Sequence, residues 1–162
     1  MKTLKLSCLI LLLTLAFSVM AQTKDAAAPH VDLISIDGTI NPAVDDFIRE
    51  SIGRAKAGGA KALIIQLDTP GGLLNSTRTI VKEMLGAEVP LMVYVAPSGA
   101  GAGSAGVFIT MAAHIAAMAP GTNIGAAHPV AGAGQEVKGA MGEKIENFTA
   151  SFSESIAQKR GR

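Results

Sequence analysis

A short, almost uninterrupted apolar run, Ala62–Leu67, constrains the fold of this chain more than any other feature. The run reads Ala-Leu-Ile-Ile-Gln-Leu, and the segment Asp68–Gly72 (Asp-Thr-Pro-Gly-Gly) ends it. A strand that is apolar on both faces is typical of a parallel sheet covered on both sides, because a solvated face would carry polar residues. The run therefore predicts an α/β fold built on a parallel sheet.

Strand-like and helix-like segments alternate along the rest of the chain. Strands are predicted at residues 31–36, 91–95 and 114–118, and helices at about 41–57, 73–85, 107–113 and 143–160. The first helix has the clearest start, since Asn41 suits the N-cap and Pro42 suits the first helical position. Residues 119–129 are rich in turn formers. The alternation predicts right-handed crossovers, with the functional loops at the carboxyl edge of the sheet.

The segment Gly99–Gly106 (Gly-Ala-Gly-Ala-Gly-Ser-Ala-Gly) contains a single hydroxyl, on Ser104. Glycine permits positive φ and close approach of the backbone, and the first turn of a helix offers free N–H groups that can hold an oxyanion. These properties favour Ser104 as a nucleophile, with a helix N-cap serine as the structural alternative. The segment also fits the dinucleotide pattern G-x-G-x-x-G, but no acid follows before Glu136 to hold a ribose.

The first 21 residues have the pattern of a secretory signal. Lys2 and Lys5 precede an apolar run over residues 9–17, and Val19-Met20-Ala21 fits a signal-peptidase site. We expect cleavage before Gln22, with an uncleaved anchor as the alternative. A flexible lead-in at residues 22–30 and one domain at residues 31–162 are then expected to follow.

Charge and composition exclude several classes of function. The chain has 14 Lys and Arg and 13 Asp and Glu, so removal of the two leader lysines leaves 12 basic residues and a net charge of −1. Without a basic cluster, nucleic acid is not an expected partner. Cys8 lies in the leader, and the three histidines show no metal-ligand spacing. No cofactor or metal is expected.

Three segments together resemble one family. They are Ile64–Gly72, Gly103–Gly106 (Gly-Ser-Ala-Gly) and Met118–Ala126 (Met-Ala-Pro-Gly-Thr-Asn-Ile-Gly-Ala). They are similar to the N-terminal protease domain of the NfeD family, the membrane-bound Clp-class serine proteases also called stomatin operon partner proteins. The resemblance covers residues 31–162. It implies a Clp/crotonase-type ββα spiral fold, an α/β fold whose C-terminal part is missing from this chain.

The resemblance also implies a catalytic site. The serine nucleophile falls on Ser104 and a lysine general base falls on Lys144. The oxyanion donors fall on the Gly71-Gly72 turn and on the backbone N–H of Ala105. A lysine serves as a base when burial disfavours its charged form, so this lysine should lie away from water. The glycine-rich loop at residues 131–142 is expected to be mobile and to cover the substrate.

His128 is the alternative general base. The soluble Clp proteases resemble distant relatives of this chain. In them, a histidine base follows the serine at about this separation. A Ser-His-Asp arrangement needs an acid to orient the histidine, and no Asp follows Asp68 in this chain. Glu136 or an acid earlier in the chain would have to serve. Otherwise His128 is expected to line the site.

The implied function is an exported serine endopeptidase that cuts apolar segments of membrane-associated proteins, such as stomatin-like partners. The family continues with further protease sequence, transmembrane segments and a small β-barrel. The resemblance therefore implies a membrane-anchored, homo-oligomeric full-length protein on the periplasmic side. One alternative is a crotonase-type acyl-CoA enzyme, against which export and the missing basic cluster argue. Another is an inactive scaffold or partner-binding domain, against which the presence of Ser104 and Lys144 argues.

Overall fold

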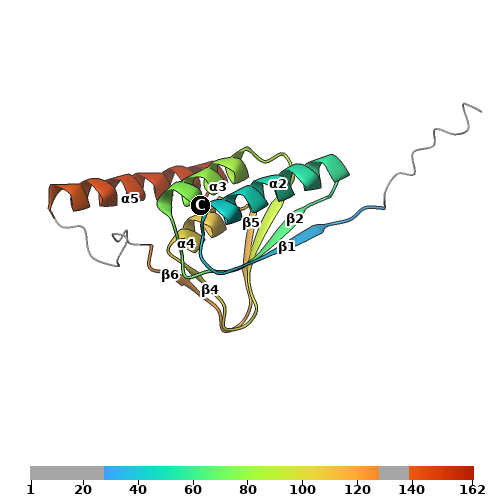
Figure 1. Ribbon diagram of the computed structural model, residues 1–162, viewed down its shortest axis with the longest axis horizontal. Coiled ribbons are helices and arrows are strands. Elements are labelled where there is room, and N and C mark those ends of the chain that lie inside the picture. Colours follow the sequence, from blue (N-terminus) through green and yellow to red (C-terminus); the bar gives the residue numbers. More distant parts are fainter. Residues whose placement is uncertain (1–27, 128–138) are drawn as a thin grey trace, which may run out of the picture.

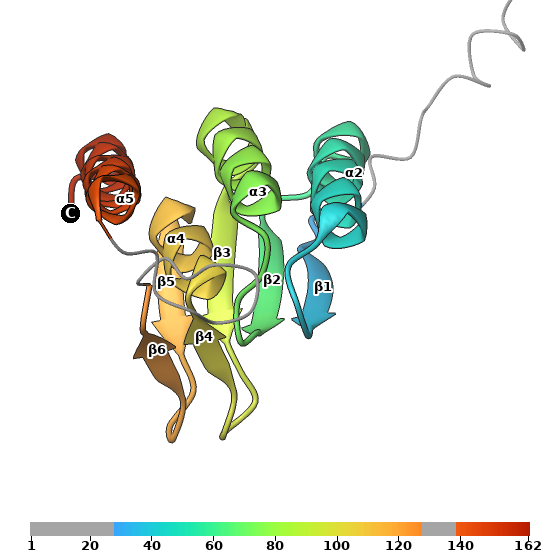
Figure 2. The same cartoon turned by 60° about the vertical axis from the view of Figure 1, so that its left-hand side comes forward.

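The computed structural model describes residues 28–127 and 139–162. A parallel four-stranded sheet has the order β1-β2-β3-β5. Its strands are β1 (Asp32–Asp37), β2 (Leu63–Asp68), β3 (Leu91–Val95) and β5 (Ile115–Met118). The helices are α2 (Pro42–Gly58), α3 (Leu74–Gly86), α4 (Ala105–Ala112) and α5 (Ala140–Arg160). All four helices lie on the same side of this sheet (Figure 2). The predicted alternation of strands and helices over the described residues is confirmed.

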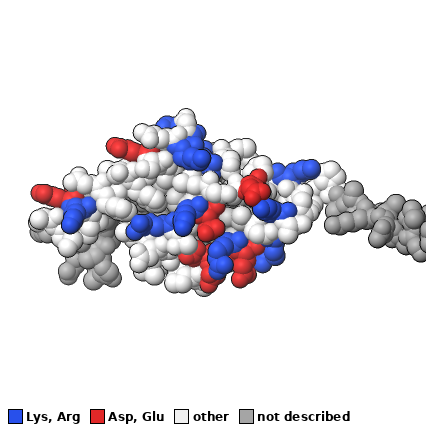
Figure 3. Space-filling view, turned by 90° about the horizontal axis from the view of Figure 1, so that it is seen from above, with Lys and Arg blue, Asp and Glu red and all other residues white. Residues whose placement is uncertain are grey.

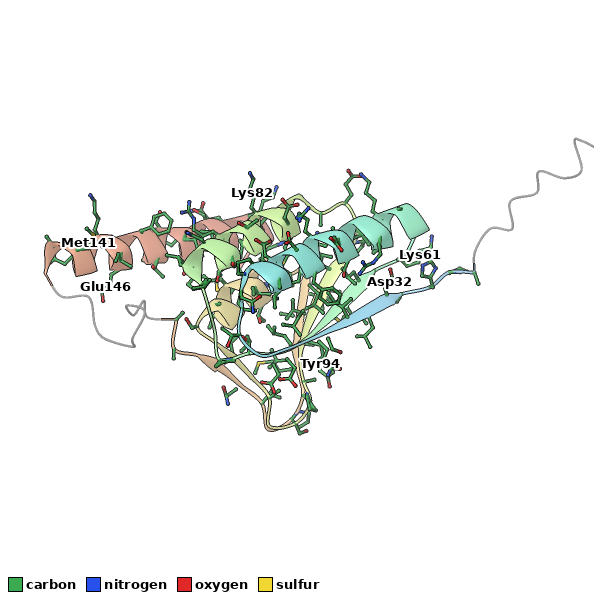
Figure 4. The ribbon with its side chains drawn as sticks, viewed as in Figure 1. Asp32, Lys61, Lys82, Tyr94, Met141 and Glu146 are labelled. Atoms are coloured by element: carbon green, nitrogen blue, oxygen red, sulfur yellow. The ribbon has the colours of Figure 1, made fainter. Side chains whose placement is uncertain are left out.

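The sheet is buried on its helix side and half-open on the other. In β2, the side chains of Leu63, Ile65 and Leu67 are fully buried, whereas the intervening Ile64 and Gln66 are only half-buried. The expectation that this strand is buried on both faces is therefore wrong for the described chain, because helices cover one face alone. Tyr94 of β3 points away from the helices, on the open face (Figure 4).

Helix α2 begins and ends through local signals in its own sequence. The Asn41 side chain caps it by accepting a hydrogen bond from the N–H of Val44 (3.1 Å), and Pro42 is its first residue. Gly59 ends it in the left-handed conformation with φ of 72°, and the Gly59 N–H reaches the carbonyls of the last turn. The predicted start at Asn41-Pro42 and the glycine stop are confirmed.

A second, two-stranded parallel sheet pairs β4 (Gly101–Gly103) with β6 (Asn123–Gly125). The sequence indicated only a glycine run and turns for these segments, so the strands were missed. A Cβ added at Gly101 would lie 2.9 Å from Asn123 Oδ1, so glycine lets the two strands approach. The small sheet extends from the carboxyl edge of the main sheet, below α4 (Figures 1 and 2).

Helix α5 runs beside α4 and projects beyond it. The Phe152 ring lies 5.5 Å from the Phe108 ring, and Arg160 donates hydrogen bonds to the carbonyls of Ala112 (2.7 Å) and Met84 (2.9 Å). At about 1.5 Å per residue, α5 is roughly 30 Å long and α4 roughly 12 Å. The first turns of α5 therefore extend past the body of the domain (Figure 1). Positive and negative side chains are interspersed on the face seen in Figure 3.

Candidate functional site

Three segments that are far apart in sequence meet around Ser104. The loop after β2 joins β4 through two backbone hydrogen bonds: Thr69 N–H to Gly101 O (2.8 Å) and Gly103 N–H to Thr69 O (2.9 Å). The N–H of Ser104 donates to Gly125 O in β6 (3.1 Å). The serine therefore lies at the junction of the main sheet, the small sheet and the start of α4.

Ser104 has a strained backbone and an unused hydroxyl. Its φ of 47° and ψ of −106° lie in a backbone region that residues other than glycine rarely adopt. Ser104 is the residue just before α4, but its side chain makes no capping hydrogen bond to that helix. Position alone therefore matches the N-cap alternative, and the half-buried hydroxyl is free for other chemistry.

The structure brings Gly71 directly against Ser104. Gly71 has φ of 122°, and a Cβ built on it would lie 2.7 Å from Ser104 Cβ and 3.2 Å from Ser104 Oγ. No side chain fits in that space. Gly103 is similarly close to the opposite loop, since its Cβ would lie 2.9 Å from Pro70 O. The two glycine-rich motifs of the sequence thus form one site.

The three predicted oxyanion donors differ in what their N–H groups do. The N–H of Gly71 donates to the Thr69 hydroxyl (3.1 Å). Within the described residues, the N–H groups of Gly72 and Ala105 have no hydrogen-bond acceptor. Gly72 is exposed, and Ala105 opens α4, where the first N–H groups of a helix have no partner in the helix itself. Gly72 and Ala105 are therefore the two free donors beside the serine.

Within the described residues, Lys144 makes no hydrogen bond to Ser104. It is exposed on the second turn of α5, and the labelled residues on either side of it, Met141 and Glu146, lie at the projecting end of that helix (Figure 4). Lys144 precedes Phe152 by about 12 Å of helix, whereas Ser104 precedes the contacting Phe108 by about 6 Å. The lysine is thus at the same end of the molecule as the serine, but about one turn further out.

The predicted alternative base, His128, lies outside the described residues. Residues 131–138, which form most of the expected lid, also lie outside them. His114 has a structural role, since its Nδ1 accepts a hydrogen bond from the N–H of Leu91 (3.1 Å). Burial, and then the charge of Arg160, lower the pKa of His114. His30 lies near Asp32, away from the serine, at an Nε2 to Oδ1 distance of 3.7 Å.

The sequence analysis missed two residues that shape the site. The Asp68 carboxylate accepts a hydrogen bond from the N–H of Gly101 (2.9 Å), and buried Thr69 holds the glycine turn. Their position directly before Pro70-Gly71-Gly72 is the only sequence signal for either role. Apolar side chains are exposed near the site: Leu73 and Leu74 at the start of α3, and Ile124 in β6.

The described ranges hold neither a cluster of metal ligands nor a helix suited to span a membrane. In residues 28–127 and 139–162, no three His, Cys, Asp or Glu side chains gather as metal ligands. Among those same residues, no helix combines the length and apolar content needed to cross a membrane.

The sequence is similar to membrane proteins of known family. A family model described as "NfeD1b, N-terminal domain" matches residues 30–162. Membrane-bound protease PH1510 of Pyrococcus horikoshii is 37% identical over 157 residues, which are 95% of this chain and 34% of the relative. Membrane protein NfeD1b of Bacillus subtilis is 30% identical over 132 residues, which are 82% of this chain and 29% of that protein. The chain thus spans about a third of the length of these relatives.

Solved structures share the fold. A serine-to-alanine variant of the 1510-N membrane-bound stomatin-specific protease matches with a TM-score of 0.77 and 37% identity, over 84% of this chain and 66% of that one. A lysine-to-alanine variant in complex with a substrate peptide matches with the same TM-score, over 63% of its chain. ClpP1 of Listeria monocytogenes matches with a TM-score of 0.58 at 22% identity, over 80% of this chain and 79% of that one, which shows the fold alone.

These matches confirm the expected Clp-type α/β fold and the expected family. The match to the family model covers nearly all of the described domain, and the relative at 37% identity covers almost the whole chain. The chain therefore belongs to the NfeD family and corresponds to the N-terminal domain of NfeD1b.

Proposed function

We propose that this chain is the protease domain of an exported serine endopeptidase that cuts apolar segments of membrane-associated proteins. The observation that carries the proposal is the setting of Ser104. Its hydroxyl makes no capping hydrogen bond to α4, its backbone is strained, and it lies beside two free N–H donors. Backbone strain of this kind is concentrated at active sites. The relative at 37% identity is named a protease, which supports the same reaction here.

In the proposed reaction, Ser104 Oγ attacks the carbonyl carbon of the scissile peptide bond while a base takes the hydroxyl proton. The carbonyl oxygen becomes an oxyanion that the N–H groups of Gly72 and Ala105 stabilise. The base then returns the proton to the leaving amine, and an acyl ester remains on Ser104. Water hydrolyses that ester by the same route.

Lys144 is the proposed base. Helix α5 runs alongside α4, so that the first turns of both helices lie at one end of the molecule. Its amine is exposed and would have to lose contact with water before it could take a proton. Solved variants of the 1510-N protease replace a serine and a lysine, the two residue types that the proposal assigns here.

The proposed substrates are apolar segments of other proteins. Exposed Leu73 and Leu74 follow the donor Gly72, and exposed Ile124 belongs to the strand that holds the Ser104 N–H. Both sides of the serine thus offer apolar surface to an extended peptide. The relative with a solved structure is described as stomatin-specific, and we extend that to a stomatin-like partner of this protein.

We also propose that residues 1–21 are removed on export and that the mature protein is a homo-oligomer outside the cytoplasm. Mass spectrometry of the exported protein should find Gln22 at the N-terminus, since Val19-Met20-Ala21 is the well-placed cleavage pattern. A mature protein that retains Met1 would replace this proposal with an uncleaved membrane anchor.

Peptidase assays on the full-length protein test the Ser-Lys pair. Ser104→Ala and Lys144→Ala should each remove nearly all turnover of an apolar peptide, and the double variant should be little worse, because the two groups act as one unit. Ser98→Ala and Lys159→Ala, which alter exposed residues on the serine loop and at the far end of α5, are the matched controls.

Other outcomes would assign other roles. Near-normal turnover of Lys144→Ala together with an inactive His128→Ala would transfer the base to His128. The exposure of Lys144 favours a second candidate function, a partner-binding domain without activity. That candidate is supported if the wild-type protein and Ser104→Ala show the same absence of turnover while both still bind a stomatin-like protein.

A further inference from the structure

Thr69 carries a buried hydroxyl that makes two hydrogen bonds to one residue. The residue is 2% exposed. The hydroxyl donates to the carbonyl of Gly71 (3.2 Å) and accepts from the N–H of Gly71 (3.1 Å). Thr69 therefore holds both peptide groups that flank Gly71.

The second of those peptide groups also carries the N–H of Gly72. In a trans peptide, the C=O and the following N–H point in opposite directions. The Gly71 C=O is held by the Thr69 hydroxyl and by the N–H of Ile40 (2.8 Å), so the Gly72 N–H is directed away from both. We propose that Thr69 is a positioning residue, whose hydroxyl fixes this peptide so that the Gly72 N–H serves as an oxyanion donor; the inference rests on the proposed function.

Thr69 also fixes the serine side of the site. Its backbone N–H and C=O hold Gly101 and Gly103 in β4. Its methyl group packs at the start of α4, where a Cβ added to Gly106 would lie 2.8 Å from Thr69 Cγ2. One buried residue thus sets the Gly72 donor through its hydroxyl and the Ala105 end of α4 through its methyl group.

Loss of the hydroxyl should release the donor peptide. Gly71 has φ of 122°, and glycine passes between conformations that other residues avoid. Without the Thr69 hydroxyl, the Gly71 N–H loses its acceptor and the Gly71 C=O keeps only its bond to Ile40. The peptide between Gly71 and Gly72 can then rotate, which turns the donor away from the oxyanion.

The test separates shape from hydrogen bonding in the full-length protein. Thr69→Val keeps the shape and removes the hydroxyl, so kcat for an apolar peptide should fall about 10-fold to 100-fold while KM changes less than about 3-fold, as for a weakened oxyanion hole. Thr69→Ser keeps the hydroxyl and should stay within about 3-fold of wild type. Thr77→Val is the control, since the buried Thr77 hydroxyl, within the described residues, donates only to the carbonyl of Leu73 (2.9 Å), the residue before α3.

Hydrogen exchange of the Gly71 and Gly72 amides tests the same hydrogen bonds without a peptidase assay. In protein with ¹⁵N-labelled glycine, NMR should find that the Gly71 amide is protected from exchange and that the Gly72 amide exchanges fast. Thr69→Val should speed the exchange of Gly71, and Thr69→Ser should not. Unchanged exchange and an unchanged kcat in Thr69→Val would overturn the role of Thr69. Absent turnover in the wild type would overturn only the proposed function, because the exchange result would still decide whether Thr69 holds the turn.

Discussion

Substitution of Gly71 by alanine probes the closest approach in the candidate site. The new methyl would be placed 2.7 Å from Ser104 Cβ and 3.2 Å from Ser104 Oγ, on a backbone with φ of 122°. Two separate penalties follow. An L-residue at that φ costs about 1–3 kcal/mol, and overpacking against fixed neighbours costs about 1–3 kcal/mol more. We expect Gly71→Ala to lower the free energy of unfolding by about 2–6 kcal/mol.

Gly38 provides a matched control for the backbone penalty. It has the same φ of 122°, but a Cβ added there meets no atom within 4 Å. Gly38→Ala should therefore cost only the strain of about 1–3 kcal/mol. The difference between the two variants isolates the contact with Ser104, and urea unfolding followed by circular dichroism measures it.

The double variant Gly71→Ala with Ser104→Gly identifies the residue responsible. Removing the serine side chain takes away the two atoms nearest to the new methyl, so the double variant should recover about 1–3 kcal/mol relative to the sum of the single variants. Gly38→Ala with Ser104→Gly should show additive effects. If Gly71→Ala costs no more than Gly38→Ala, the glycine turn and the serine are not packed as described.

Three further predictions concern groups outside the site, each measured by the same urea titration. Thr110→Val should leave the free energy of unfolding unchanged or raise it by about 1 kcal/mol, because the Thr110 hydroxyl is buried with no partner in the described residues; a loss above about 1 kcal/mol would contradict this. Arg160→Met should lower it by about 2–4 kcal/mol, because the charged hydrogen bonds to Ala112 and Met84 are lost; a change below about 0.5 kcal/mol would show that they do not anchor α5. Burial and then Arg160 lower the pKa of His114 from 6.5, so the unfolded chain takes up the proton first and stability should fall as the pH drops below about 6.5; His114→Gln should flatten that fall, and an equal slope in both proteins would exclude His114 as its cause.

Local sequence signals predicted the main sheet and its helices. Asn41-Pro42 starts α2 through contacts within one turn, and the apolar runs that become β2 and β3 differ clearly from their polar flanks. The position of Ser104 at the start of α4 also followed, because a glycine run between a strand and a helix leaves few alternatives.

Features that depend on distant partners did not follow from local patterns. The β4 and β6 strands lack alternation and a run of β-branched residues, and their pairing depends on glycines that admit a partner about twenty residues away. The helical spacing of Phe148, Phe152 and Ile156 predicted α5. It did not predict that the first turns of α5 extend beyond α4. Phe148 therefore remains 42% exposed, and Lys144 remains in solvent.

The hydrogen bonds around Ser104 also bear on the stage of folding at which its backbone conformation forms. The hydrogen bond from Gly101 to Asp68 closes a loop of 33 residues, and the bond from Ser104 to Gly125 requires β6 as well. Closing such loops costs chain entropy before any contact repays it, so non-local pairings of this kind form slowly. We therefore expect Ser104 to take up its strained conformation late in folding, after β6 has paired with β4.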